Sequence, residues 1–530
     1  MELCQKALSV HAYDGKANYL YGLCHQVMGN KIDAMDGFSI ASRSVDFRSA
    51  AYDKLAEMYV STKNLAKAES FAGKALEYNV HNLSAKHLQM VIGRLNHTER
   101  KALIEQVLKE TPLYHPARYE AYKAGLITKE AFTSAIRNEL SQEVYIEMAD
   151  TYSRIGCEQD AMDILSMIED YPIANYKRAL LLDQHGDAQG AKALVEKANG
   201  QSAVQVFPHR VSALKALEYA AKTSQNWKPT YYQALVYWAN QQADKALELM
   251  ESCKDVDFAP FYLSRATLKK GDAKLADLKK AETLDKSWRT GFALINHYID
   301  TKQWKEGDAV GKKYMKWYPD CYVIGLKYAR VLSELGQDDK SLKLLNGLMV
   351  LPNEGASAGR VVYRTAHLNR AVKFLNANKV AAAKKEIEAS TIWPENLGVG
   401  KPYDHMIDMR IENYLEAEAY SRMGDKAKAD EYYRKVANYG AGGSTFKAAN
   451  LLNALSLKAL GQQEQADEMV KGWSKYGNDL ITQCCTAVYK GDKSKVASLL
   501  ENYRTPDENA PWEVSRRDND FELLMNLFSK

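Results

Sequence analysis

The sequence predicts an all-α protein that folds as a right-handed α-α superhelix, a solenoid of stacked helical hairpins. The first observation is a fixed period, since Ala34, Ala68 and Ala102 lie 34 residues apart. The second is that prolines are few, 12 in 530 residues, and that Pro172 and Pro319 stand where a hairpin should end. The third is that strand-like alternation of apolar and polar residues is almost absent.

Small and aromatic residues recur at fixed positions within each period. With the second-helix alanine placed at position 20, the first full copy has Gly22 at position 8 and Ala34 at position 20. The next copy has Ala56 and Ala68 at these positions. Small side chains there allow the two helices of a hairpin to approach closely. Larger side chains at positions 11 and 24, such as Phe38, fill the space towards the neighbouring hairpin.

The same frame continues along the chain. The residues at positions 8 and 20 of the further clear copies are Ala149 and Ala161, Ala234 and Ala246, Ile295 and Gly307, Ala329 and Ser341, Ala371 and Ala383, Ala417 and Ala429, and Ala454 and Ala466. Weaker copies lie near Ala102, Ala191 and Ala276. A consistent register argues against the alternative, a non-repetitive helical protein with chance periodicity. The pattern resembles the tetratricopeptide (TPR) repeat family, which implies a TPR solenoid.

The frame also predicts how the chain is divided. We expect an array over residues 1–503, with roughly 14 hairpins and an irregular loop at 391–405. Counting back from the first full copy places Ala7 at position 27, so the array opens in mid-repeat. This favours a larger protein cut before Met1, and a degenerate opening cap is the alternative. Residues 504–530 should form a connector and a C-terminal capping helix over the last hairpin.

Composition narrows the classes of function. A net charge of +4 with 26% charged residues gives no reason to expect a nucleic-acid partner. Without an apolar run long enough to span a bilayer, we expect no membrane insertion. The seven cysteines show no metal-binding or disulfide pattern. The N-terminus does not resemble a signal peptide, which implies a cytoplasmic protein if Met1 is the native start. A truncated chain would leave a periplasmic or secreted location open.

A second resemblance concerns longer segments. They are similar to one bacterial multidomain family, and comprise Ala7–Asp14 with Ala17–Gly22, Asp33–Ser39 with Arg48–Tyr52, and Pro394–Pro402. In that family a β-sandwich resembling galactose mutarotase precedes a long TPR region, and members commonly occur with carbohydrate-handling proteins. The resemblance therefore implies an N-terminal β-sandwich as the neighbouring domain, a carbohydrate as a further ligand, and a chain cut before Met1.

Motifs for catalysis are absent from the sequence. It contains no GxSxG, HExxH or P-loop pattern, and its 11 histidines are dispersed. His405 stands beside Asp404, but a neighbouring pair alone does not make a catalytic site. We therefore expect no catalytic residues, no metal and no cofactor in this chain.

The segment 393–403 is the strongest departure from the repeat, because its glycines and prolines prevent a continuous helix. Insertions in solenoids often lie on the binding face. The candidate binding residues of this loop are Trp393, Glu395, Asn396, Lys401 and Tyr403. The two aromatic rings could stack on a sugar ring while the polar groups bond its hydroxyls. The alternative is a structural connector that packs Trp393 and Leu397 against neighbouring helices.

The groove formed by the first helix of each hairpin is the other candidate site. Its candidate binding residues are Tyr19, Tyr231, Trp238, Arg330 and Tyr414. The Lys, Asn and Arg residues that a peptide-carboxylate clamp needs are not repeated there, so a mixed groove for a protein or an adjacent domain is expected. Packing of these aromatics within the array is the alternative. The leading hypothesis is a non-catalytic interaction scaffold; the second is an accessory part of a carbohydrate-active enzyme, with loop 393–403 in a composite sugar site.

Overall fold

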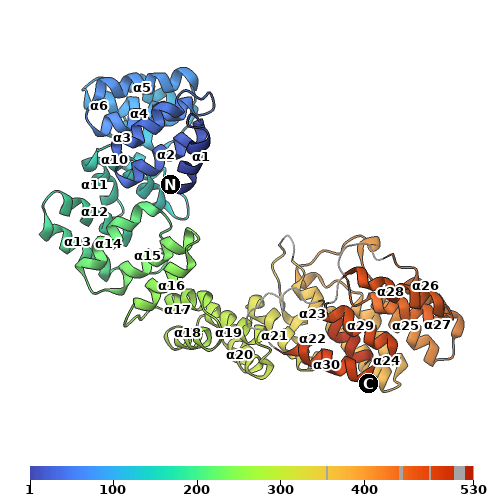
Figure 1. The fold of residues 1–530 in the computed structure, drawn as a ribbon. Helices are drawn as coiled ribbons and strands as arrows, with labels where there is room; N and C mark the ends of the chain where they lie inside the picture. Colours follow the sequence, from blue (N-terminus) through green and yellow to red (C-terminus); the bar gives the residue numbers. More distant parts are fainter. Residues whose placement is uncertain (354–355, 441–445, 477–478, 506–517, 519, 529–530) are drawn as a thin grey trace. The chain divides into compact units, whose positions relative to one another are not determined.

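The computed structural model describes residues 1–353, 356–440, 446–476, 479–505, 518 and 520–528. Every regular element in this part of the chain is a helix, so the prediction of an all-α solenoid is confirmed. The chain forms two compact units, Met1–Val256 and Asp257–Lys530, and within each unit successive helices pair into hairpins (Figure 1).

The N-terminal unit contains sixteen α-helices among its residues. They are α1 (Glu2–Val10), α2 (Gly15–Met28), α3 (Lys31–Ala41), α4 (Arg48–Ser61), α5 (Leu65–Tyr78), α6 (Leu83–Leu95), α7 (Lys101–Glu110), α8 (His115–Lys123), α9 (Lys129–Thr133), α10 (Ser141–Arg154), α11 (Glu158–Ser166), α12 (Pro172–Gln184), α13 (Ala188–Gly200), α14 (Leu214–Thr223), α15 (Trp227–Ala239) and α16 (Ala243–Ser252).

The C-terminal unit continues with fifteen more α-helices in its described residues. They are α17 (Ala259–Leu268), α18 (Gly271–Leu284), α19 (Trp288–Asp300), α20 (Trp304–Trp317), α21 (Tyr322–Glu334), α22 (Asp338–Gly347), α23 (Ala358–Asn376), α24 (Val380–Ser390), α25 (Arg410–Arg422), α26 (Lys426–Ala437), α27 (Asn450–Ala459), α28 (Gln463–Lys471), α29 (Leu480–Lys490), α30 (Lys493–Arg504) and α31 (Phe521–Phe528).

The turn inside each hairpin has one backbone signature. Five residues before the small second-helix residue, the backbone has a positive φ, which reverses the chain between the two helices. This occurs at Gly29, Lys63, His97, Gly156, Gly186, Gln241, Gly271, Lys302, Gly336, Asn378, Gly424 and Gly461. The set includes the turns before Ala102, Ala191 and Ala276, the three weak copies. Glycine adopts this conformation without strain, and the non-glycine turns show that the hairpin imposes it.

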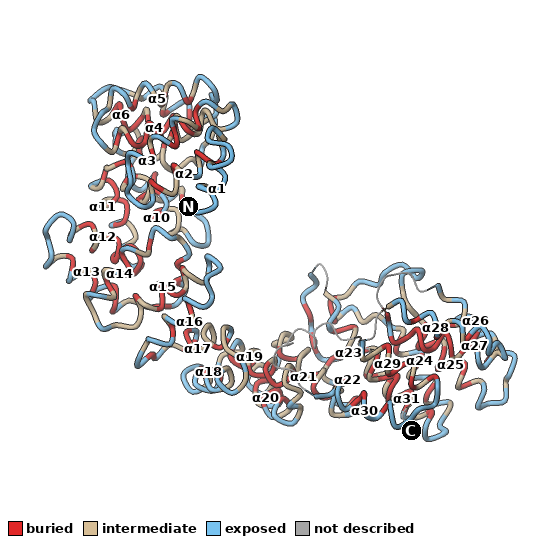
Figure 2. Tube along the Cα trace, in the orientation of Figure 1, coloured by how far each residue is buried: buried red, intermediate tan, exposed pale blue. Residues whose placement is uncertain are grey.

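Close packing explains the small residues of the repeat. Ala34 is fully buried, and a Cβ added at Gly22 would lie 2.7 Å from the ring of Phe38. In a later copy the sizes are exchanged, because Gly311 stands at position 24 and the ring of Tyr328 fills its space, 2.2 Å from an added Cβ. Buried residues therefore follow the helix faces turned towards neighbouring helices (Figure 2).

Candidate functional site

The C-terminal helix α31 lies on the first helices of earlier hairpins. Its side chains Phe521, Leu523, Leu524 and Met525 are at most 2% exposed and belong to one apolar cluster with residues of α25 and α27. We call this seat the first-helix surface and define it by four residues, Arg364, Glu412, Tyr414 and Ala448. Burial of four large apolar side chains is the main force that holds α31 there.

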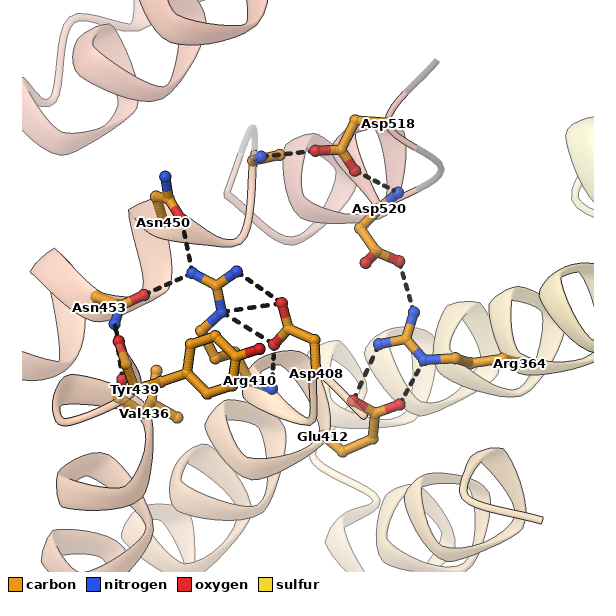
Figure 3. A network of polar contacts seen from close by, with 11 residues as sticks. Arg364, Asp408, Arg410, Glu412, Val436, Tyr439, Asn450, Asn453, Asp518 and Asp520 are labelled. Carbon is orange, nitrogen blue, oxygen red and sulfur yellow. Dashed lines mark hydrogen bonds and ion pairs between the residues drawn. The ribbon is translucent and has the colours of Figure 1, made fainter. Parts of the chain in front are cut away.

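A charged contact fixes the start of α31 on this surface. Arg364 of α23 forms a two-pronged ion pair with Glu412 of α25, at 2.6 and 3.0 Å, and its third nitrogen donates to Asp520 at 2.6 Å (Figure 3). Glu412 is 2% exposed. A guanidinium suits this task because its planar fork can satisfy two carboxylates at once. Arg364 thus joins two hairpins and the C-terminal helix.

Asp518 makes the second polar anchor. Its Oδ2 accepts a hydrogen bond of 2.6 Å from the backbone N–H of Ala448, at the approach to α27, and its Oδ1 accepts one from the N–H of Asp520 (Figure 3). Burial raises the pKa of Asp518 above its ordinary value. The acidic residues precede the N-terminal end of α31, where the helix dipole favours negative charge.

Aromatic contacts fix both ends of the apolar face of α31. Phe528 meets Tyr414 of α25 edge-on, with ring centroids 5.9 Å apart, and Phe521 meets Tyr503 of α30 at 4.5 Å. Tyr414, a groove candidate of the sequence, is 7% exposed and also contacts Tyr433. It therefore belongs to the first-helix surface, covered by α31. Because α31 also contacts α23 and α25, it covers more than the last hairpin, α29–α30, over which a capping helix was expected.

A second polar network connects the starts of α25 and α27. Arg410, 1% exposed, pairs with Asp408 and donates to the side-chain oxygens of Asn450 and Asn453, at 2.7 and 2.9 Å (Figure 3). Burial would raise the pKa of Asp408, but its bonds to Arg410 outweigh this and lower it. The guanidinium also lies 4.6 Å from the ring centre of Tyr439. These contacts lock the starts of α25 and α27 together.

Arg330, another groove candidate, lines a cavity of about 400 Å³ in the same unit. The cavity is bounded by α19, α21 and α23 and by Tyr503, Asp518 and Glu522 from the C-terminal segments. Arg330 thus shares a cavity with Glu522, near the N-terminal end of α31, whereas Tyr414 contacts Phe528 at the C-terminal end of that helix. The sequence alone does not reveal this relationship.

The other three groove candidates lie in the N-terminal unit and are not gathered at one place. Tyr19 packs against Phe38 and Phe47. Tyr231 is 4% exposed and belongs to the packed interior. Trp238 is half-buried and lines a separate pocket of about 290 Å³ with Phe207, Leu235 and three neighbours.

The N-terminal unit buries its own charged network near Tyr19. Glu57 of α4 is 2% exposed and pairs with Lys54 and with Arg154 of α10, which lies 97 residues away. Burial would raise the pKa of Glu57, but the two cations outweigh it and lower it. Asp53, one turn earlier, has its pKa raised to about 6 by burial and by the charge of Glu57. Its Oδ2 accepts a hydrogen bond from Ser84.

Of the five candidate residues in loop 393–403, two make structural contacts and three are exposed to solvent. Asn396 donates to the backbone carbonyls of Leu345 and Leu348, at 2.9 Å each, and so closes the end of α22. The ring of Trp393 lies 4.6 Å from the guanidinium carbon of Arg360. The connector interpretation named Trp393 and Leu397, and Leu397 is 1% exposed.

The remaining loop candidates are exposed. Lys401 pairs with Asp404 at 2.8 Å, and Tyr403, 76% exposed, stacks on His405. Glu395 is exposed as well. Whether these three bind a sugar stays a prediction.

Sequence reasoning missed Arg364, Asp520 and Arg410. Arg364 and Arg410 precede the positions that the repeat frame weighs, and their partners lie in other hairpins. The only local signal was the pair of acidic residues, Asp518 and Asp520, directly before the apolar face of the last helix.

The chain has no match among protein-family models or among curated proteins. Three solved structures share low sequence identity with it. Yeast Tom70 is 11% identical with a TM-score of 0.29, over 92% of this chain and 99% of that one. Naa15/Naa10 bound to HypK-THB gives 12% and 0.27, over 99% and 88%. The APC/C hetero-tetramer Cut9–Hcn1 gives 12% and 0.26, over 96% and 98%. Similarity of this degree does not extend to a shared function.

Two further observations bear on the type of site. Among the described residues, no group of three or more His, Cys, Asp or Glu side chains is arranged to hold a metal ion. None of the helices in the described part combines the length and the hydrophobicity that crossing a bilayer requires.

Proposed function

We propose that this chain is a non-catalytic protein-binding scaffold, and that its first-helix surface holds a short amphipathic helix of a partner. The observation that supports this proposal is α31 itself. It is an eight-residue helix that lies across the first helices of other hairpins, held by an apolar face and by charged contacts to Arg364 and Arg504. This arrangement is a helix-in-groove mode of recognition, with the chain's own tail as the occupant.

The contacts of α31 define what a partner helix must carry. Phe521, Leu524, Met525 and Phe528 follow the i, i+3, i+4, i+7 spacing of one helix face. An acidic residue directly before that face is needed for Arg364, which already neutralises Glu412 with its other nitrogens. A partner is therefore an amphipathic helix with an acidic N-terminal end.

Competition with α31 sets the strength of binding. A helix attached to the same chain has an effective concentration in the millimolar range, so a free partner must overcome it. Binding should therefore be weak in the intact protein and should increase when the apolar face of α31 is disrupted.

A peptide titration tests the proposal. A fluorescein-labelled peptide of residues 518–530 is titrated into the full chain and into a full chain carrying Leu524→Asp and Met525→Asp. We expect saturable binding to the variant, at least tenfold tighter than to the unmodified chain, and loss of binding for a peptide with Asp520→Lys. A folded variant that fails to bind the peptide would refute the proposal.

An accessory role beside a carbohydrate-handling domain is the second candidate function. It is favoured by Tyr403, whose ring is 76% exposed in the loop that departs from the repeat, next to Lys401 and Glu395. In this proposal an N-terminal β-sandwich is the adjacent domain, and the loop completes its sugar site. A glycan-binding screen with the chain and with Tyr403→Ala tests it, and Tyr403→Ala should weaken any binding. If the chain binds no sugar, the loop does not bind sugar on its own.

A further inference from the structure

The cavity between α21 and α23 combines an apolar lining with two cationic side chains. Its volume is about 400 Å³, within the range of small-molecule pockets. Apolar atoms come from all three of its helices, among them Phe292 of α19, Leu326 of α21 and Val361 of α23. Lys327 and Arg330, three positions apart on α21, line the same cavity. Residues at this spacing share one helix face.

The two cations are poorly neutralised by the protein. Lys327 has no carboxylate within ion-pair distance in the described part of the chain, and its Nζ lies 5.8 Å from the ring centre of Phe292. Arg330 reaches Glu334 only at 3.9 Å. Burial and the charge of Arg330 lower the pKa of Lys327, and Asp300 opposes this shift. Two neighbouring positive charges that are partly buried repel each other, and a bound anion would relieve this repulsion.

Of the three acidic side chains that line the cavity, Glu334 lies 3.9 Å from Arg330, and the other two, Asp518 and Glu522, are bonded elsewhere. Asp518 accepts from the backbone N–H groups of Ala448 and Asp520, and Glu522 pairs with Arg504 at 2.8 Å. They are therefore not the counter-ions of the α21 cations. The cavity offers donors for an anion at α21 and apolar surface at α19 and α23.

We propose that this cavity is a binding site for a small organic anion, a carboxylate or sulfonate joined to an apolar ring or short chain. The anionic group lies between Lys327 and Arg330, and the apolar part contacts Phe292, Leu326 and Val361. Charge-assisted hydrogen bonds orient the ligand, while burial of its apolar part supplies affinity. The cavity adjoins α31, since Glu522 lines it, but the proposed ligand contacts lie on α19, α21 and α23, so the proposal does not depend on the scaffold function.

A fluorescent probe tests the site in the full chain. The probe is 1-anilinonaphthalene-8-sulfonate, whose emission rises when its rings leave water. We expect a saturable class of probe sites, from which 4-phenylbutyrate displaces the probe. The double variant Lys327→Met and Arg330→Met should bind the probe at least fivefold more weakly at this class. Lys343→Met, an exposed lysine on α22 outside the cavity, is the matched control and should bind like the unmodified chain.

A second variant tests the role of the cavity volume without changing the two cations. Val361→Trp fills the space between the helices and keeps both cations, so it should remove the same class of probe sites. Circular dichroism of each variant shows that the helices are retained. Unchanged probe affinity in both folded variants would overturn the proposal, as would equal weakening by Lys343→Met. If Val361→Trp unfolds the protein, the double charge variant alone decides, because its long apolar side chains preserve the packing of α21.

Discussion

Arg364 Nη1 and Asp520 Oδ1 lie 2.6 Å apart, although 156 residues separate them in the sequence. The same guanidinium holds the buried carboxylate of Glu412. This one side chain therefore links the position of the C-terminal helix to the packing of two hairpins. Substitutions of its two acidic partners should have different consequences.

Asp520→Asn should loosen α31 while the hairpins stay intact. Arg364 keeps Glu412 as its partner, and its ion pair with Asp520, which is 27% exposed, contributes about 1 kcal/mol. We expect faster amide hydrogen exchange across residues 521–528 and unchanged exchange in α23 and α25. Asp404→Asn, which breaks an exposed ion pair in the loop, is the control and should leave α31 unaffected. Unchanged exchange of α31 in Asp520→Asn would contradict this account.

Arg364→Gln should be far more damaging. It leaves Glu412, 2% exposed, without its cation, and an uncompensated buried charge destabilises by about 3–5 kcal/mol. We expect a lower midpoint for unfolding of the C-terminal unit in urea, and faster exchange in α23, α25 and α31 together. An effect no larger than that of Asp520→Asn would show that the Arg364–Glu412 pair is unimportant.

Leu524→Ala should weaken the seat of α31 through lost apolar contacts. Leu524 is fully buried, and truncation of a buried leucine costs about 2–5 kcal/mol. Asn526→Ala changes an exposed residue of the same helix and is the matched control. Hydrogen exchange of α31 should rise at least tenfold for Leu524→Ala and not for Asn526→Ala. Equal effects of the two substitutions would mean that α31 is not held by its apolar face.

Asp53→Asn should change how the stability of the N-terminal unit depends on pH. The folded-state pKa of about 6 lies above the ordinary 3.8, so the folded protein holds this proton more tightly than the unfolded chain. Stability is therefore lost as the pH rises from about 4 to about 6. The variant should be more stable than the original by about 1–3 kcal/mol at pH 8 and should gain nothing at pH 4. Urea unfolding at both pH values checks this; a gain at pH 4 of the same size would contradict it.

Asn396→Ala should lower the stability of the protein, because the Asn396 side chain has a structural role in the loop. The change leaves the carbonyls of Leu345 and Leu348 without their donor, which costs about 1–3 kcal/mol. Glu395→Ala, its exposed neighbour, is the control and should leave stability unchanged within about 0.5 kcal/mol. Thermal unfolding followed by circular dichroism compares them. Equal melting temperatures for Asn396→Ala and the original chain would remove the structural role of this side chain.

Local periodicity explains how much of the fold the sequence could predict. The small residues of each hairpin pack within the hairpin itself, so their spacing is visible in the sequence, as at Gly22 and Ala34. Even the weak copy at Ala102 is a true hairpin, because His97 adopts the same positive φ as the glycine turns. The turn residue, five positions before the small second-helix residue, need not be glycine, because the hairpin imposes the positive φ.

The candidate site was harder to predict because its contacts are long-range. Tyr414 was identified at a groove position, but its burial depends on Phe528, more than a hundred residues later. Asn396 was a candidate to bond a ligand, and in the structure its amide donates to carbonyls at the end of α22. An amide that can bond a sugar can equally bond a carbonyl of the backbone, and residue type alone does not distinguish the two.

Photo-crosslinking tests the central claim most directly. A peptide of residues 518–530 with benzoylphenylalanine in place of Phe528 is irradiated with the full chain carrying Leu524→Asp and Met525→Asp, and the attachment site is mapped by mass spectrometry. We predict attachment to α25 or α26, around Tyr414 and Tyr433, and its loss when unlabelled peptide is in excess. Attachment confined to residues outside the C-terminal unit would contradict the proposal that the first-helix surface binds a helix.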